Sequence, residues 1–144
     1  MARSRITGTV EEALAIEESL LGRKLPRSFS DWLLDNNGLD IEEVHIYPVR
    51  DERDTRKTWE SLSYLLINDW AEGLLKFNQA IYSHLLPFAD SGTSDYFCFD
   101  YSVPGENGER PIVLWSHKTG KTEFFAVDFR EFEMKILAGA SGSY

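Results

Sequence analysis

Cysteine is scarce in this chain, since Cys98 is the only one among 144 residues. A single cysteine cannot form an intramolecular disulfide, so nothing in the sequence points to an oxidising compartment. Cys98 stands between Phe97 and Phe99 in a stretch with the pattern of a strand, where small buried hydrophobic residues are common. We therefore expect a structural residue and not a catalytic thiol.

Long apolar runs are also absent. The most apolar stretch, residues 64–67, is far shorter than the roughly 20 residues that a membrane-spanning helix needs. Residues 1–12 contain basic side chains with no apolar segment behind them, which is not the pattern of a secretory signal. The sequence therefore predicts a cytoplasmic chain that has no membrane partner.

Positive charge is in short supply: 15 Lys and Arg residues stand against 24 Asp and Glu residues, which gives a formal net charge of −9. This balance repels the phosphate backbone, so nucleic acid is not an expected partner. An acidic surface steers basic proteins instead, although charge of this size also simply keeps an ordinary domain soluble.

Motifs for metal binding or catalysis are missing as well, because HExxH, CxxC, HxH, GxSxG and the P-loop pattern do not occur. The histidines stand far apart, at His45, His84 and His117. Asp95 and Asp100 invite comparison with a catalytic carboxylate pair, but their odd offset places them on opposite faces of one strand. We expect no catalytic residue, no metal and no cofactor, although a site assembled across a fold leaves no local motif.

Helical spacing predicts two short helices at the start of the chain. Thr9 and Glu12 have the spacing of a capping box, and Gly22 has the position of a helix C-terminus. Pro26 suits the beginning of the second helix, which the Asn-Asn-Gly of residues 36–38 would end.

The middle of the chain changes pattern twice. Alternation predicts a strand over residues 42–49, and the mixed charges of residues 50–57 predict a solvated loop. Residues 58–80 are predicted to be helical with a break near residues 68–69. The inward-facing residues of that helix are predicted to be Trp59, Leu62, Leu66, Trp70, Leu74 and Phe77.

Strand patterns dominate the last part of the chain. They cover residues 85–90 and 94–101, and residues 111–116 and 122–127 form a predicted hairpin. Asp128, with Glu131 three residues on, caps a last helix whose predicted inward residues are Phe129, Phe132, Ile136 and Leu137. Together these patterns predict one α+β domain: two N-terminal helices, a curved and mostly antiparallel sheet flanked by helices, and a C-terminal helix.

Three segments in this order resemble the signatures of the SUKH superfamily, which includes the fungal Smi/Knr cell-wall regulators and many bacterial immunity proteins. The first is residues 16–38, IEESLLGRKLPRSFSDWLLDNNG. The second is residues 85–101, LLPFADSGTSDYFCFDY, in which Ser and Thr occupy a turn that is often richer in glycine. The third is residues 111–120, PIVLWSHKTG, and the Phe-rich segment 128–137 completes the likeness. The positions that match the first signature are Glu18, Leu21, Gly22, Leu25, Pro26, Phe29, Trp32, Leu33, Asn37 and Gly38.

This resemblance implies an α+β domain over residues 9–137, with residues 1–8 and 138–144 as tails. It also implies a non-catalytic binding role, because bacterial members are often immunity proteins that neutralise toxins, many of them nucleases or deaminases, by direct binding. The acidic balance fits a basic toxin domain as the protein partner. The signature residues themselves are expected to be structural.

The partner-facing surface is expected among exposed acidic and aromatic side chains around the sheet. Each candidate has an ordinary alternative, which is a solvated surface charge. The candidates are Asp40, Glu42, Glu43, Asp95, Asp100, Tyr101, Glu106 and Glu109.

Two other functions stay open from the sequence. One is a regulatory adaptor of the cell-wall-regulator type that binds endogenous proteins, and the shortness of the chain speaks mildly against it. The other is a hydrolase or small-molecule binder with a site between sheet and helices. That function would place His84 or His117 beside a carboxylate in a deep polar pocket.

Overall fold

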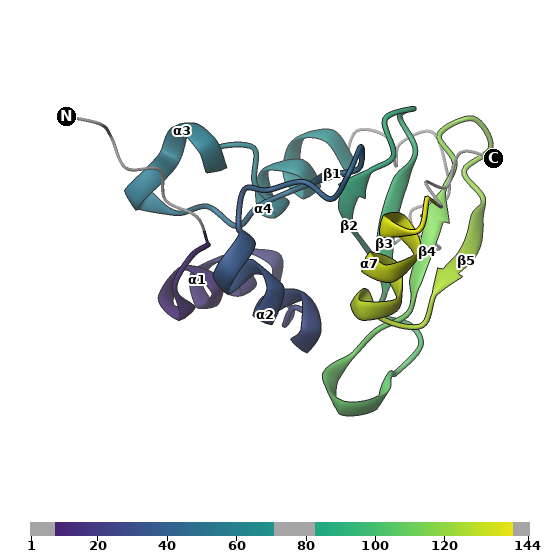
Figure 1. Cartoon of the computed structure of the whole chain (residues 1–144), viewed down its shortest axis with the longest axis horizontal. Coiled ribbons are helices and arrows are strands. Elements are labelled where there is room, and N and C mark those ends of the chain that lie inside the picture. Colours follow the sequence, from purple (N-terminus) through teal and green to yellow (C-terminus); the bar gives the residue numbers. More distant parts are fainter. Residues whose placement is uncertain (1–7, 71–82, 140–144) are drawn as a thin grey trace.

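The computed structural model of the chain describes residues 8–70 and 83–139 (Figure 1). Helices α1 (Glu11–Leu21) and α2 (Arg27–Asn36) come first, and helix α7 (Phe129–Leu137) follows a five-stranded sheet. Short helical turns lie between the first two strands: a 3-10 helix (Glu52–Asp54), α3 (Thr55–Thr58), α4 (Leu62–Tyr64) and a π-helix (Leu65–Trp70). The α+β prediction is confirmed. Within the described residues, no helix is long and apolar enough to cross a membrane.

The sheet is antiparallel throughout, and its strands lie side by side in chain order. The strands are β1 (His45–Ile46), β2 (Leu85–Asp90), β3 (Tyr96–Asp100), β4 (Ile112–Trp115) and β5 (Thr122–Ala126). In the centre Cys98 pairs with Pro87 on one side and with Val113 on the other. The predicted strands 85–90 and 94–101 and the predicted hairpin are therefore confirmed.

One face of the sheet carries the larger apolar core. Phe88 and Phe99 stack with their ring centroids 4.1 Å apart, and Phe29 of α2 lies 5.3 Å from each. On α7, Phe129 lies 5.0 Å from Phe29, and Phe132 lies 5.1 Å from Phe88. Helices α2 and α7 therefore cover the same face, and Figure 1 shows α7 across the sheet.

Because side chains alternate along a strand, Cys98 points to the opposite face from Phe97 and Phe99. Cys98, Val113 and Trp115 form a second buried cluster there. Trp70, at the end of the π-helix, packs edge-on against Trp115 with the centroids 4.9 Å apart. The central strand β3 is thus apolar on both faces, as a covered strand requires.

Three predicted helix ends are confirmed. Gly22 adopts the left-handed conformation (φ 76°) at the end of α1, and its N–H donates to Glu18 O. Pro26 directly precedes α2. At α7 the Asp128 carboxylate accepts the Glu131 N–H at 2.9 Å, and the Glu131 carboxylate accepts the Val127 N–H at 2.8 Å.

The predicted capping box at the first helix is wrong. The N-cap of α1 is Val10, and no side chain bonds there. The Thr9 hydroxyl instead donates to Asp51 Oδ2 at 2.7 Å, 42 residues further along the chain. The Thr9 hydroxyl therefore bonds to a buried carboxylate far along the chain and not to a backbone N–H of α1.

The middle of the chain also departs from prediction. The predicted strand over residues 42–49 shortens to His45–Ile46, which form the ladder with β2, and Tyr47 adds one N–H bond to Phe88 O at 2.9 Å. The predicted solvated loop over residues 50–57 is helical instead, and Asp51 within it is buried. The predicted long helix starts at Leu62, and no break occurs at residues 68–69 because the π-helix runs through them.

Two predicted inward residues face solvent. Trp59 is 52% exposed, since it precedes the helix that begins at Leu62 and lies on none of its faces. Leu137 is 58% exposed because it lies one position past Ile136, about 100° around α7 from the buried side. Leu74 and Phe77 lie outside the described residues, as do most of the two predicted tails.

Candidate functional site

The tip of the connection between α2 and β1 is a tight turn of residues 41–44. Ile41 and Val44 bond to each other in both directions, with N–H to O distances of 3.1 and 2.9 Å, and both side chains are buried. Glu42 has a positive φ of 53°, which this turn requires, and Glu42 and Glu43 are both exposed. The 41–44 turn therefore presents two adjacent carboxylates from a buried base.

A buried amide closes the loop that contains this turn. Asn37 donates from Nδ2 to Val49 O at 3.0 Å and accepts from Val49 N at 2.9 Å through Oδ1. Within the loop, Asp40 Oδ1 accepts the Ile46 N–H at 3.1 Å and lies 2.8 Å from His45 Nδ1. The backbone on both sides of the 41–44 turn is thus held by side chains.

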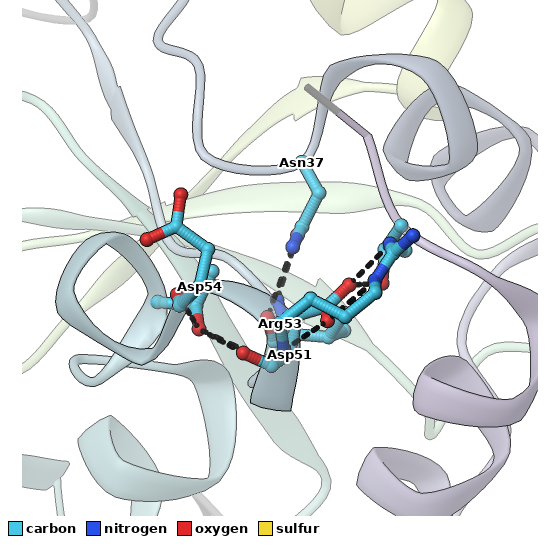
Figure 2. Close-up of polar contacts among 7 residues, drawn as sticks. Asn37, Asp51, Arg53 and Asp54 are labelled. Atoms are coloured by element: carbon cyan, nitrogen blue, oxygen red, sulfur yellow. Dashed lines mark hydrogen bonds and ion pairs between the residues drawn. The ribbon is translucent and has the colours of Figure 1, made fainter. Parts of the chain in front are cut away.

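Asp51 holds the segment behind this loop (Figure 2). Its carboxylate accepts from Arg53 Nε at 2.9 Å, from Arg53 Nη2 at 2.7 Å, from the Arg53 backbone N–H at 2.9 Å and from Thr9. The Asp51 N–H donates to Thr58 Oγ1 at 2.9 Å. The hydrogen bonds from the Arg53 side chain hold the pKa of Asp51 well below its usual range, although burial acts in the opposite direction.

A hollow of about 200 Å³ lies between the 41–44 turn and the end of α7. Glu42 and Glu43 line one side, the exposed Leu137 supplies most of the apolar surface, and the buried Val44 and Ile136 complete the lining. This acidic hollow combines two exposed carboxylates with an apolar wall. Such a combination suits the aliphatic stem and charged head of a lysine or arginine.

Tyr101 lies in a different part of the molecule, at the start of the loop of residues 101–111. Two guanidinium groups lie over its ring, with Arg23 at 4.6 Å and Arg110 at 5.0 Å from the centroid. Its hydroxyl donates to Lys24 O at 2.6 Å. Burial raises the pKa of Tyr101, and the two arginines only partly offset that rise. Tyr101 is therefore a packing residue that joins the loop to the start of α2.

Glu109 closes the same loop onto α2. Its carboxylate accepts the Ser28 N–H at 2.9 Å and the Ser28 hydroxyl at 2.7 Å, so it supplies the negative charge that a helix N-terminus favours. Glu106 is exposed at the tip of the loop. Only Glu106 of this pair is thus a free surface charge.

Replacing Glu109 by alanine is expected to lower the free energy of unfolding by about 1–2 kcal/mol, because Ser28 loses both acceptors at the helix start. Urea denaturation followed by tryptophan fluorescence measures the change. The matched substitution Glu106→Ala should change stability by less than about 0.5 kcal/mol. Equal effects of the two substitutions would show that the contact to Ser28 contributes nothing.

The remaining two candidates lie at opposite ends of β3. Asp95 accepts from His117 N at 3.0 Å and lies 2.7 Å from His117 Nδ1. Asp100 accepts from Ser102 N and Oγ at 2.9 and 2.6 Å and lies 3.5 Å from His84 Nε2. Asp95 and Asp100 each bond to residues near their own end of β3, and the two carboxylates do not meet in one site.

Every histidine of the chain thus has one aspartate beside it, and these pairs are separate. Among residues 8–70 and 83–139, no group of three or more His, Cys, Asp and Glu side chains could hold a metal ion. The eight predicted partner-facing residues therefore fall into three places: the 41–44 turn with Asp40, the 101–111 loop with Asp100, and the position of Asp95.

Cys98 is expected to resist thiol reagents in the folded protein. It is fully buried, and burial raises the pKa of its thiol. Labelling with a chromogenic disulfide at pH 8 should be at least about 100-fold slower in buffer than in denaturant. Fast labelling of the folded chain would show that this face of the sheet opens.

Comparison with known families assigns the fold. The sequence profile described as "SMI1 / KNR4 family (SUKH-1)" matches residues 8–135, which is most of the chain. The chain belongs to the SMI1 / KNR4 family. This confirms the resemblance in the sequence, and no curated protein matches the chain.

In this SUKH-1 chain the signature residues have structural roles. Glu18 accepts the Leu25 N–H at 2.8 Å and so closes the connection between α1 and α2. Gly22 ends α1 in the left-handed conformation, and Asn37 bonds both backbone groups of Val49. These signature residues therefore maintain the scaffold.

Proposed function

We propose that this SUKH-1 chain is a non-catalytic immunity protein, acting in the cytoplasm, that neutralises a cognate toxin domain of the nuclease or deaminase type by binding it directly. Membership of the SUKH-1 family over residues 8–135 is the observation that carries the proposal. Inhibition by binding needs a complementary surface and no reactive group. The three His–Asp pairs are separate and make local contacts, which agrees with a protein that acts by binding and without a reactive group.

The acidic hollow is the best-supported contact surface for a basic toxin domain. Glu42 and Glu43 are exposed, whereas Asp40, Asp95, Asp100 and Glu109 already bond to neighbouring groups. The base of the 41–44 turn is rigid, so little conformational entropy is lost when a partner binds. Charge complementarity there would also accelerate association with a basic protein.

Co-expression with the toxin domain encoded beside this chain tests the proposal. Cells that make both proteins should grow, and the two should co-purify. Growth arrest despite expression of folded chain would rule out neutralisation. A chain that protects no cell but captures endogenous host proteins reproducibly would support the regulatory adaptor instead.

A further inference from the structure

Positive charge gathers at one place on this acidic chain. A hollow of about 500 Å³ lies between the start of α2 and the 101–111 loop, and Lys24, Arg27 and Arg110 line it. Among the described residues, Glu18 is the only acidic one in its lining. The chain as a whole has a net charge of −9, so this cationic hollow has the opposite sign to the chain's net charge.

The cationic hollow is built from two segments that are distant in sequence and firmly joined. Glu109 accepts two hydrogen bonds from Ser28, and the Tyr101 hydroxyl donates to Lys24 O. The loop itself is tightly shaped, because a Cβ on Gly105 would lie 2.1 Å from Glu109 O. The walls are therefore preorganised before any ligand arrives.

The cations of this hollow are left without acidic partners. Lys24 and Arg27 are exposed, and neither side chain has a hydrogen bond or ion pair to any residue that the structure describes. Arg110 stacks on Tyr101 and reaches only a carbonyl, Val103 O, at 3.4 Å. Glu18 Oε2 already accepts the hydrogen bond from the Leu25 N–H. An arriving anion would therefore meet charge that is not yet neutralised.

Two features separate this hollow from phosphate and nucleotide sites. The helix N-terminus that commonly binds phosphate is already occupied, since Glu109 takes the Ser28 N–H of α2. Arg23 and Arg110 both lie over the Tyr101 ring, where a nucleobase would otherwise stack.

We infer that the cationic hollow binds an acidic segment of a protein partner, with two or more Asp or Glu side chains paired to Lys24, Arg27 and Arg110. Arginine forks match carboxylates in bidentate geometry, and recognition of acidic motifs by clustered cations is a recurring mode. This site has the opposite polarity to the acidic hollow of the proposed function. Two sites of opposite sign would fix the orientation of one partner or admit a second.

A peptide titration tests this inference without any toxin, so its failure is distinct from failure of neutralisation. A blocked hexapeptide of alternating Asp and Glu is added to ¹⁵N-labelled chain, with the Asn/Gln hexapeptide as its uncharged match. We expect shifts at residues 24–30 and 107–110, a dissociation constant of about 0.1–1 mM, and several-fold weakening between about 50 and 200 mM salt.

The decisive variant is Lys24→Glu with Arg27→Glu, which should weaken peptide binding at least about tenfold. Its matched control is Lys118→Glu with Lys121→Glu, which changes net charge equally in the turn between β4 and β5, at the opposite end of the sheet (Figure 1). The control should bind within about twofold of the original chain.

If the glutamate variant loses its native spectrum, Lys24→Gln with Arg27→Gln replaces it. Three results would overturn the inference: no shifts at millimolar peptide, equal losses in variant and control, or binding of inorganic tripolyphosphate but not of the acidic peptide. The last result would assign the hollow to a small anion.

Discussion

Reversal of both charges on the 41–44 turn, by Glu42→Lys with Glu43→Lys, is expected to weaken binding of a basic partner by about 10²–10³-fold. Two attractive contacts are lost, and two repulsive ones replace them beside the apolar wall formed by Ile136 and Leu137. Lysine accepts the positive φ at position 42 as well as glutamate does, so folding should be unaffected. Calorimetric titration with the partner domain measures the change.

A charge-matched control separates the local contact from long-range steering. Glu106→Lys with Glu123→Lys changes net charge equally at two exposed positions on other elements. We expect less than about a threefold loss of affinity, mainly through slower association. Equal losses in the two double variants would assign the effect to net charge, and unchanged affinity in the first would exclude the 41–44 turn.

Replacing Asp51 by asparagine is expected to lower the free energy of unfolding by about 2–4 kcal/mol at pH 7. The asparagine side chain cannot accept all the hydrogen bonds that Arg53 and Thr9 donate, and its NH₂ group would face other donors. The matched control is Glu52→Gln, because Glu52 is the adjacent residue and bonds only to the exposed Arg50. That substitution should cost less than about 0.5 kcal/mol.

The difference in stability between the original chain and the Asp51→Asn variant is also expected to depend on pH. The pKa of Asp51 is held below its ordinary value, so its contribution is complete above about pH 5 and is lost as the pH falls below about 4. The gap between the original chain and the Asp51→Asn variant should therefore narrow between pH 7 and pH 3. A gap of constant size would show that ionisation of Asp51 adds nothing to stability.

Local patterns predict the elements whose causes are local. Gly22 ends α1, and Asp128 with Glu131 begins α7, through bonds that span a few residues. The central strand β3 follows from a short apolar run bounded by turn residues, because both of its faces are covered.

The sequence-based predictions are wrong where the local structure depends on a contact with a residue that is distant in sequence. Thr9 has the spacing of a helix cap, but a buried carboxylate 42 residues away binds its hydroxyl. The charged run around Asp51 reads as solvated for the same reason, since the sequence does not show that Asp51 is buried against Thr9. Nothing local in the sequence marks Asn37 as the partner of Val49.

The candidate site shows the same limit. Acidic side chains are visible in a sequence, but the groups that neutralise them are not. Glu109 and Glu106 look alike in sequence, and the structure separates them because Ser28, 81 residues from Glu109, binds only one of them. The cationic hollow was missed for the same reason, since Lys24 and Arg27 meet Arg110 only in the folded chain.

Direct inhibition by a purified SUKH-1 chain is the central claim, and titration of toxin activity tests it most simply. The catalytic activity of the purified cognate toxin domain is measured while this chain is added in increasing amounts. The account predicts that activity falls to near zero at about one equivalent, as tight stoichiometric binding requires. Full activity at a large excess of folded chain would contradict it.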